Sequence, residues 1–295
     1  MALQTSGAIS LNNVNVELGN SGTAYITIGS ADVRGLFGVA SGTISLSDGY
    51  GKSSGPAAPT RGVFGGGNAG SASNVMDYIT IATTGNATDF GDLLFAQEGR
   101  GTASSGTRGL WGGGGGIMSN IDYITIATTG NAIDFGDLTV NRFYLTGISN
   151  ETRGVFAGGE AAYNALNVMD YITIASTGNA TDFGDLTVIR LALAGCASAT
   201  RGVFGGGSDR STYRNIIDYI TIASTGNATD FGDLTSNSAY VGALASDTRG
   251  CWAGGLANAV KLNNIAYVTI ATTGNATDFG DLTLARQGPS GVSGS

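Results

Sequence analysis

Histidine is absent from this 295-residue chain, and lysine, cysteine and proline are rare. Without histidine, no Ser-His-Asp or Cys-His catalytic group and no imidazole general base can form, and zinc loses one of its usual ligands. Charged residues make up only 12% of the chain, and the formal net charge is -8. Binding to a nucleic-acid backbone requires clustered lysine and arginine, which this chain lacks. The sequence therefore predicts a protein that is not an enzyme and does not bind nucleic acid.

Long apolar runs are also missing. None approaches the roughly 20 residues that a membrane-spanning helix needs, and the N-terminal residues lack the charged and apolar regions of a secretory signal. With two cysteines, Cys196 and Cys251, the chain fits synthesis in a reducing cytoplasm. We expect both thiols to behave as small apolar side chains rather than to form a disulfide. We likewise expect no membrane insertion.

Glycine, by contrast, is abundant and falls in a repeated pattern. Arg-Gly-Val-Phe-Gly-Gly-Gly at 61–67 is followed by Met-Asp-Tyr-Ile-Thr-Ile-Ala at 76–82 and Thr-Asp-Phe-Gly-Asp-Leu at 88–93. Versions of these motifs return four more times, at intervals of 45 to 48 residues. A period of this size is typical of one four-stranded propeller blade. The five copies lie near residues 60–93, 107–138, 152–186, 200–234 and 248–282.

Each copy predicts four strands. The Asp-Tyr-Ile-Thr-Ile-Ala motif alternates bulky and small residues and is rich in β-formers, and a Gly-Asn-Ala turn separates it from a short outer strand, Thr-Asp-Phe-Gly-Asp-Leu. Arg-Gly-Val-Phe-Gly-Gly predicts another strand. The apolar stretches before each Arg-Gly, such as Val140–Ile148 and Val188–Cys196, suit an inner strand near the axis. No pattern of an amphipathic helix occurs.

The copies resemble kelch-type propeller repeats, over residues 55–295. In the first copy the residues that carry the resemblance are Phe64-Gly65-Gly66, Tyr78, Phe90 and Leu93. The arginine of the family's inner strand has counterparts at Arg142, Arg190 and Arg286, whereas Ser238 fills that position once and phenylalanine replaces the family's usual tryptophan. The resemblance implies an all-β fold, a five-bladed kelch-like β-propeller with a small N-terminal β module.

The C-terminal segment 283–293 resembles an inner strand that no blade follows. We expect it to complete the first blade, because the segment before that blade, 55–60, is short and contains proline. Such closure joins the two chain ends and removes an open sheet edge. An open array, or one completed within a trimer, is the alternative.

Residues 1–54 do not share the repeat and form a separate predicted domain. Short strands are predicted at Ala8–Leu11, Thr23–Ile28, Val33–Val39 and Thr43–Leu46. The segments Ser-Gly-Ala-Ile-Ser-Leu-Asn, Asp-Val-Arg-Gly-Leu and Ser-Gly-Thr-Ile-Ser-Leu-Ser-Asp resemble an N-terminal module of tailed-phage virion proteins, especially fibre-like proteins of marine and cyanobacterial phages. The resemblance implies that residues 1–54 dock the propeller to other virion proteins.

Two sets of charged residues recur in every copy or nearly so. The outer strand carries paired aspartates, at Asp89/Asp92, Asp134/Asp137, Asp182/Asp185, Asp230/Asp233 and Asp278/Asp281. A hydrolase needs one specialised pair, so five equivalent pairs favour turn hydrogen bonds or pairing with a repeat arginine, with calcium coordination as the alternative. The other set comprises Arg61, Arg108, Arg153, Arg201 and Arg249 with Asp77, Asp122, Asp170 and Asp218, and Ala266 in the fifth copy. For it we predict salt bridges between blades, with a ligand-binding arginine ring as the alternative. We predict no metal site and no cofactor.

The copies differ most in the loop after the glycine tract. These loops span 68–74, 115–120, 160–167, 208–215 and 256–264, and they should all emerge on one face of the propeller. Tyrosine mixed with serine, glycine and asparagine is typical of adaptable recognition surfaces. The candidate ligand-binding residues are Tyr163, Asp209, Arg210, Tyr213, Arg214 and Lys261. The alternative is that the loops vary without selection for binding.

These observations together favour a phage virion structural protein, a tail-fibre or baseplate-associated component that attaches to a host-surface glycan or protein through the propeller loops. The expected location is the virion, assembled in the host bacterial cytoplasm, and the expected state is a homo-oligomer such as a trimer. The alternative function is a purely architectural one, in the neck, a head fibre or the capsid decoration, without receptor binding.

Overall fold

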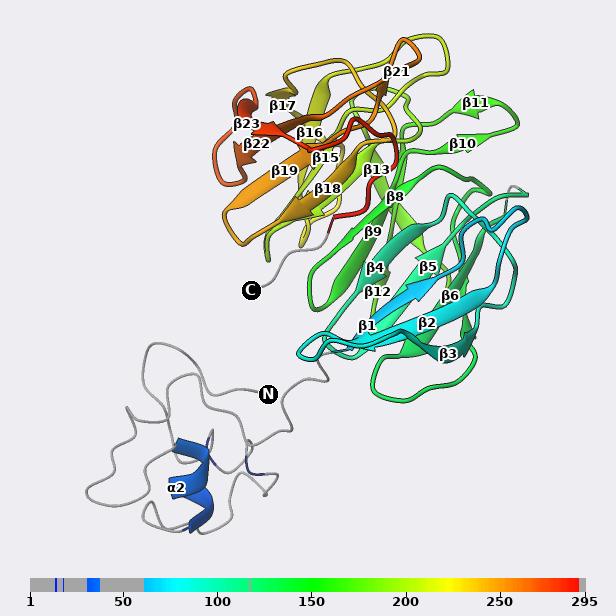
Figure 1. Ribbon diagram of the computed structural model, residues 1–295, viewed down its shortest axis with the longest axis vertical. Helices are drawn as coiled ribbons and strands as arrows, with labels where there is room; N and C mark the ends of the chain where they lie inside the picture. Colours follow the sequence, from blue (N-terminus) through cyan, green and yellow to red (C-terminus); the bar gives the residue numbers. More distant parts are fainter. Residues whose placement is uncertain (1–13, 15–17, 19–30, 38–60, 117, 292–295) are drawn as a thin grey trace. The chain divides into compact units, whose positions relative to one another are not determined.

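The computed structural model describes residues 14, 18, 31–37, 61–116 and 118–291. The chain divides into two compact units, Met1–Thr60 and Arg61–Ser295. The second unit is a succession of small antiparallel sheets whose strands follow one another along the chain, interrupted in two of the sheets by a short hairpin (Figure 1). It is an all-β, five-bladed β-propeller, as the repeat predicted.

In the first unit the described element is a short helix, α2 (Ala31–Phe37). Val33, Leu36 and Phe37 are buried, and their spacing of three and four residues places them on one side of a helix. The strand predicted at Val33–Val39 is therefore wrong, as is the expectation that the chain contains no amphipathic helix. The other strands predicted within residues 1–54 lie outside the described residues.

Among the described residues, the first blade has three strands and each later blade has four. Blade 1 consists of β1 (Arg61–Gly65), β2 (Val75–Thr80) and β3 (Thr88–Asp92); blade 2 of β4 (Gly101–Ser104), β5 (Arg108–Gly112), β6 (Asn120–Thr125) and β7 (Ile133–Asp137); blade 3 of β8 (Thr146–Ser149), β9 (Arg153–Ala157), β12 (Val168–Thr173) and β13 (Thr181–Asp185); blade 4 of β14 (Ala194–Ala197), β15 (Arg201–Gly205), β16 (Ile216–Thr221) and β17 (Thr229–Asp233); and blade 5 of β18 (Gly242–Ala245), β19 (Arg249–Ala253), β22 (Asn264–Thr269) and β23 (Thr277–Asp281). Two hairpins project from the blades, β10 (Glu160–Ala161) with β11 (Asn164–Ala165) and β20 (Leu256–Ala257) with β21 (Val260–Lys261). The predicted middle and outer strands are thus confirmed.

Adjacent blades are joined by the Gly-Asn-Ala turn. At the contact of blades 2 and 3, the Gly178 N–H donates to the Phe135 carbonyl at 2.7 Å, and the Ala180 N–H donates to the Asp137 carbonyl at 2.7 Å. The Asp137 N–H in turn donates to Asn179 Oδ1 at 3.1 Å. The same three bonds recur at the three other contacts between consecutive blades. The repeated asparagine is therefore a structural turn residue that fastens one blade to the one before it.

The hydrophobic core lies between blades. Phe156 of β9 is fully buried in a cluster that contains Phe135 and Leu138 of blade 2. Trp111, Phe204 and Trp252 occupy the same place at the other three contacts. Each of blades 2 to 5 therefore supplies one aromatic side chain to a socket built by the preceding blade, and burial of these rings stabilises the array.

The repeat arginines do not form the predicted salt bridges. Arg108 lies over the ring of Tyr123, with 4.7 Å from Cζ to the ring centroid, and donates to the Ile174 carbonyl of blade 3 at 2.7 Å. The equivalent contacts recur at Arg61, Arg153 and Arg201. The prediction failed because the register places each of these arginines opposite the threonine at the end of the next strand, three residues from the aspartate.

The buried aspartates pair instead with arginines of the linkers. Arg142 contacts Asp170 at 2.7 Å and Arg190 contacts Asp218 at 2.5 Å, all with side chains fully buried. Arg100 pairs with Asp122 at 2.6 Å in the same way. Arg142 also donates to the carbonyls of Phe156 and Val168, so each linker arginine is held by the blade that it introduces.

The inner strands are shorter than predicted. The stretch Val140–Ile148 was expected to form one, whereas β8 begins only at Thr146. The residues before it form a linker, because Arg142 turns inward to Asp170 and Tyr144 adopts a left-handed φ of 53°, which a strand does not accommodate. The arginine that the kelch resemblance placed on the inner strand therefore precedes it.

Blade 1 has no inner strand among the described residues. The segment 282–291 contains no strand, and Pro289 and Gly291 lie against Gly242 and Ala243 of β18. The pairing of 283–293 with the first blade is not present over 283–291, and residues 292 and 293 lie outside the described residues. Closure of the propeller by this segment stays a prediction.

Candidate functional site

The variable loops of blades 3 and 4 enclose a small cavity, here called the loop-face cavity. Its volume is about 190 Å³. The loop of blade 3 forms the hairpin β10–β11, and the loop of blade 4 is drawn together by an antiparallel bridge between Ser208 and Tyr213. The cavity is lined by Tyr144, Glu160, Leu191, Ser208, Arg210, Tyr213 and Tyr240.

Two of its tyrosines are placed by left-handed backbone. Tyr144 and Tyr240 have φ values of 53° and 54°, and their rings meet edge to face with centroids 5.6 Å apart. The equivalent residues of the other linkers are Gly99, Ala192 and Gly288, which also have positive φ. Their backbones form a chain of hydrogen bonds, in which the Tyr144 N–H donates to the Gly99 carbonyl, Ala192 to Tyr144, Tyr240 to Ala192 and Gly288 to Tyr240. A left-handed conformation costs a non-glycine residue roughly 1–2 kcal/mol, so strain accompanies the two tyrosines at this cavity.

The cavity contains one ion pair. Glu160 opens β10 and is completely buried, and its two carboxylate oxygens accept hydrogen bonds from Nε and Nη2 of Arg210. The Arg210 side chain is 43% exposed, and its guanidinium lies over the ring of Tyr163 at 5.2 Å. The hydrogen bond to Glu160 raises the pKa of Arg210 above its ordinary value. The charge of the buried carboxylate is therefore neutralised within the loops.

Two other polar side chains at this face, those of Tyr240 and Asp209, have shifted pKa values. Burial is the main cause of a raised pKa at Tyr240, followed by the neighbouring Tyr144 and Glu160, so its hydroxyl stays protonated. Asp209 pairs with Arg214 at 2.5 Å, and hydrogen bonds from Ser211 and then from Arg214 lower the pKa of its carboxyl. This second pair ties the blade 4 loop to itself.

The structure brings together only part of the predicted residue set. Arg210 and Tyr213 line the cavity, and Tyr163 stacks on Arg210 from outside. Asp209 and Arg214 belong to the same loop but do not line the cavity, and Lys261 lies in β21 of blade 5, away from the lining. Five lining residues were not among those predicted, namely the tyrosines Tyr144 and Tyr240 together with Glu160, Leu191 and Ser208. The two tyrosines share one repeat position, six residues after the leucine that follows each outer strand, and this was the available signal.

The lining of the cavity offers aromatic rings, hydroxyl groups and one ion pair. Its lining contains a single carboxylate, that of Glu160, whereas glycoside hydrolysis ordinarily uses two. Among the residues that the structure describes, no three His, Cys, Asp or Glu side chains lie close enough to hold a metal ion. Aromatic faces next to hydroxyl groups and a paired ion suit a small, uncharged ligand rich in hydroxyls.

Comparison with known proteins identifies no relative of this chain among protein families or curated proteins: no protein-family model matches it, and no curated protein does. In the described part of the chain, no helix is long and apolar enough to cross a membrane.

Proposed function

We propose that this chain is a structural protein of a tailed-phage virion, placed in a tail fibre or the baseplate, and that it contacts the host surface through the loop face of its propeller. Residues 1–54 would dock it to other virion proteins, as their resemblance to a phage N-terminal module implies. The observation that carries the binding role is the loop-face cavity, in which strained tyrosines, a buried glutamate and an arginine from three different parts of the chain converge.

A cavity of this size supports a weak individual contact. A saccharide bound at a dissociation constant of about 1 mM contributes about 4 kcal/mol. Several copies on one virion would raise the overall affinity by a factor of roughly 10² to 10⁴, provided that they can bind at the same time. A shallow site on a repeated structural protein is therefore sufficient for attachment.

The test compares full-length protein with three single variants in binding to host cells and to isolated surface polysaccharide. Tyr213→Ala and Tyr240→Ala remove rings that line the cavity and should weaken binding about tenfold, equivalent to about 1.4 kcal/mol. Lys261→Ala is the matched control, since Lys261 lies in the neighbouring loop outside the cavity. Equal binding by all four proteins would place the contact elsewhere. Failure of the unmodified protein to bind host cells or polysaccharide would favour the architectural role.

Docking through residues 1–54 has a separate test. Virions assembled with a chain that lacks these residues should not carry the propeller, as judged by electron microscopy and by the protein content of purified particles. Propellers retained on such particles would contradict the docking role.

A further inference from the structure

Blade 5 lacks the neighbour that covers every other blade. Phe279 of β23 is 55% exposed, whereas Phe90, Phe135, Phe183 and Phe231, at the same position of the other outer strands, are each 2% exposed. Arg249 is exposed, and its guanidinium lies over the Tyr267 ring without a hydrogen bond to any described residue. The guanidinium groups of the four equivalent arginines also donate to a carbonyl of the following blade. The face of blade 5 that carries Phe279 and Arg249 therefore resembles the buried faces of the other blades, but no described blade packs against it.

Blade 1 exposes the residues that, in blades 2 to 5, pack against the preceding blade. Phe64 is 57% exposed, although its equivalents Trp111, Phe156, Phe204 and Trp252 are buried in the sockets of the preceding blades. Ile81 is 67% exposed, whereas Ile174, Ile222 and Ile270 are buried. The turn residues Gly85, Asn86 and Ala87 are exposed too, and with the described residues they form none of the hydrogen bonds between blades that this turn forms elsewhere.

A socket for Phe64 is present on blade 5. An apolar cavity of about 240 Å³ lies among Ile265, Phe279, Leu282 and Pro289. These residues stand where Ile121, Phe135, Leu138 and Leu145 surround Phe156 at the contact of blades 2 and 3. The cavity is thus the fifth member of a set whose other four are filled by an aromatic ring of the next blade.

The buried arginine–aspartate pairs also indicate that blades 5 and 1 are neighbours. In blade 5 the linker arginine is replaced by Ser238 and its partner aspartate by Ala266, so both members of that pair are lost together. Arg286 and Asp77 are both retained, yet Arg286 is exposed and Asp77 half-buried, whereas the paired residues of blades 3 and 4 are fully buried. Arg286 stands in the linker position for blade 1, because it follows Leu282 as Arg142 follows Leu138.

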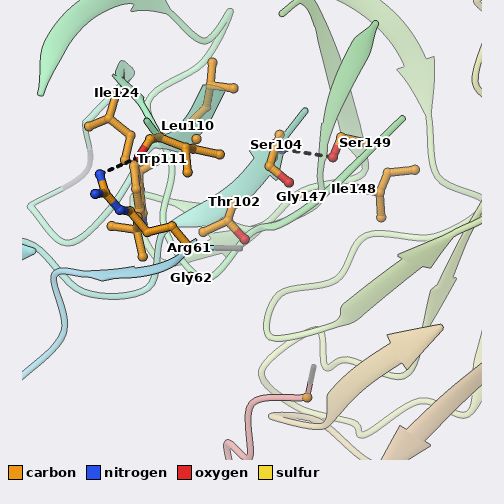
Figure 2. A pocket seen from close by; sticks show the side chains of 15 residues that line it. Arg61, Gly62, Thr102, Ser104, Leu110, Trp111, Ile124, Gly147, Ile148 and Ser149 are labelled. Carbon is orange, nitrogen blue, oxygen red and sulfur yellow. Dashed lines mark hydrogen bonds between the residues drawn. The ribbon is translucent and has the colours of Figure 1, made fainter. Parts of the chain in front are cut away.

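The C-terminal segment has the register of an inner strand. The strands β4, β8, β14 and β18 each begin eight residues after the leucine that follows the outer strand, and the same count from Leu282 reaches Ser290. Gly291 and β1 line one cavity, of about 460 Å³, in which Figure 2 shows Arg61 and Gly62 opposite side chains of β4 and β8. Gly291 also lines the apolar socket of blade 5, so the C-terminal segment borders both that socket and the edge of β1 that no described strand pairs with.

We propose that blade 1 of the same chain closes onto blade 5: Phe64 enters the apolar socket, Arg286 pairs with Asp77, and Asn86 accepts a hydrogen bond from the Asp281 N–H. The contact repeats bonds already formed at four places in the propeller. The same chain is the source because the two faces are linked through blades 2 to 4, and because Gly291 lines both the blade 5 socket and the cavity next to β1. Two faces of one chain that can meet have a higher effective concentration than a second copy in dilute solution.

The test is a disulfide between Asn86→Cys and Asp281→Cys in the full chain, with Cys196→Ala and Cys251→Val removing the native thiols. The equivalent residues Asn131 and Asp92 are hydrogen-bonded at 3.1 Å, so Asn131→Cys with Asp92→Cys is the positive control for geometry and oxidation. Asn86→Cys with Asp137→Cys is the negative control, because Asp137 is bonded to Asn179 instead. Mild oxidation should cross-link the test pair to the same extent as the positive control, within monomers and independently of protein concentration.

Two results would overturn the proposal. Cross-linked dimers whose yield rises with concentration would assign the socket to a second copy of the chain. Free thiols in the test pair, with full cross-linking of the positive control, would show that the two faces stay apart. A second measurement, the urea midpoint of Phe64→Ser, should fall in the closed propeller and stay unchanged if Phe64 remains on the surface.

Discussion

Blades 3 and 4 and the terminal blades 1 and 5 are built from nearly the same residues, yet they are buried to different degrees. In blade 3, Tyr171 and Phe183 meet edge to face at 6.0 Å, and in blade 5 Tyr267 and Phe279 do so at 5.8 Å. Phe183 is nevertheless buried and Phe279 exposed. The strands of a blade therefore set the geometry of its side chains, whereas the next blade provides their burial. The stability of such an array depends on the interfaces between its repeats as well as on each repeat, as in other repeat proteins.

The buried polar groups also differ between blades 3 and 4 and blade 5. Blades 3 and 4 each bury an arginine with an aspartate, whereas blade 5 has Ser238 and Ala266, both buried, at those positions. Blade 5 forms the same four strands without the ion pair. The pair is thus replaceable as a unit, because a buried ion pair gains little over a well-packed neutral alternative while a single buried charge is costly.

The largest effect is expected from breaking one pair in blade 4. Arg190→Ser leaves Asp218 buried without its cation and should lower the free energy of unfolding by about 3–5 kcal/mol. Arg190→Ser combined with Asp218→Ala reproduces the pair of blade 5 and should recover most of that loss. Urea unfolding followed by tryptophan fluorescence measures both. If the double variant were as unstable as the single one, the neutral pair of blade 5 could not replace the ion pair in blade 4.

A smaller effect is expected at the close approach between blades. A Cβ added to Gly184 would lie 2.5 Å from the Gly226 backbone, whereas one added to Gly280 would meet nothing within 4 Å, and both glycines have similar φ values of 134° and 135°. Overpacking costs about 1–3 kcal/mol, so Gly184→Ala should lower the urea midpoint markedly. The proposed closure predicts a similar fall for Gly280→Ala, because Gly85 would then lie against it. A clearly smaller fall would mean that blade 5 stays open.

The fold could be predicted from the sequence because its determinants are local and repeated. The period fixes the size of a blade, and motifs such as Asp-Tyr-Ile-Thr-Ile identify the strands by their alternation. The partner of each arginine could not be predicted in this way. Arg153 and Arg142 lie close together in the sequence, and only the strand register decides that Arg142 reaches Asp170 while Arg153 reaches the Ile222 carbonyl of blade 4.

The candidate site was predicted in part for a related reason. Loop variation pointed to Arg210 and Tyr213, which do line the cavity. Tyr144 and Tyr240 were missed because they lie in linkers that were interpreted as strands, and their left-handed backbone brings them to the loops of other blades. Asp209 pairs with Arg214 inside its own loop, so its charge serves the loop rather than the cavity.

The smallest effect concerns Tyr240, whose counterpart at the end of the chain is Gly288. Its pKa is raised above the ordinary 10.0, chiefly by burial. A tyrosine with a raised folded-state pKa contributes stability that is complete below about pH 10 and is lost as pH rises toward its folded pKa, since only the unfolded chain then releases the proton. Urea midpoints should therefore fall more between pH 9 and about pH 11 in the unmodified protein than in Tyr240→Phe, with Tyr163→Phe, at an exposed hairpin tip, as the matched control. An identical decline in the unmodified protein and Tyr240→Phe would mean that the cavity does not hold this hydroxyl in its protonated form.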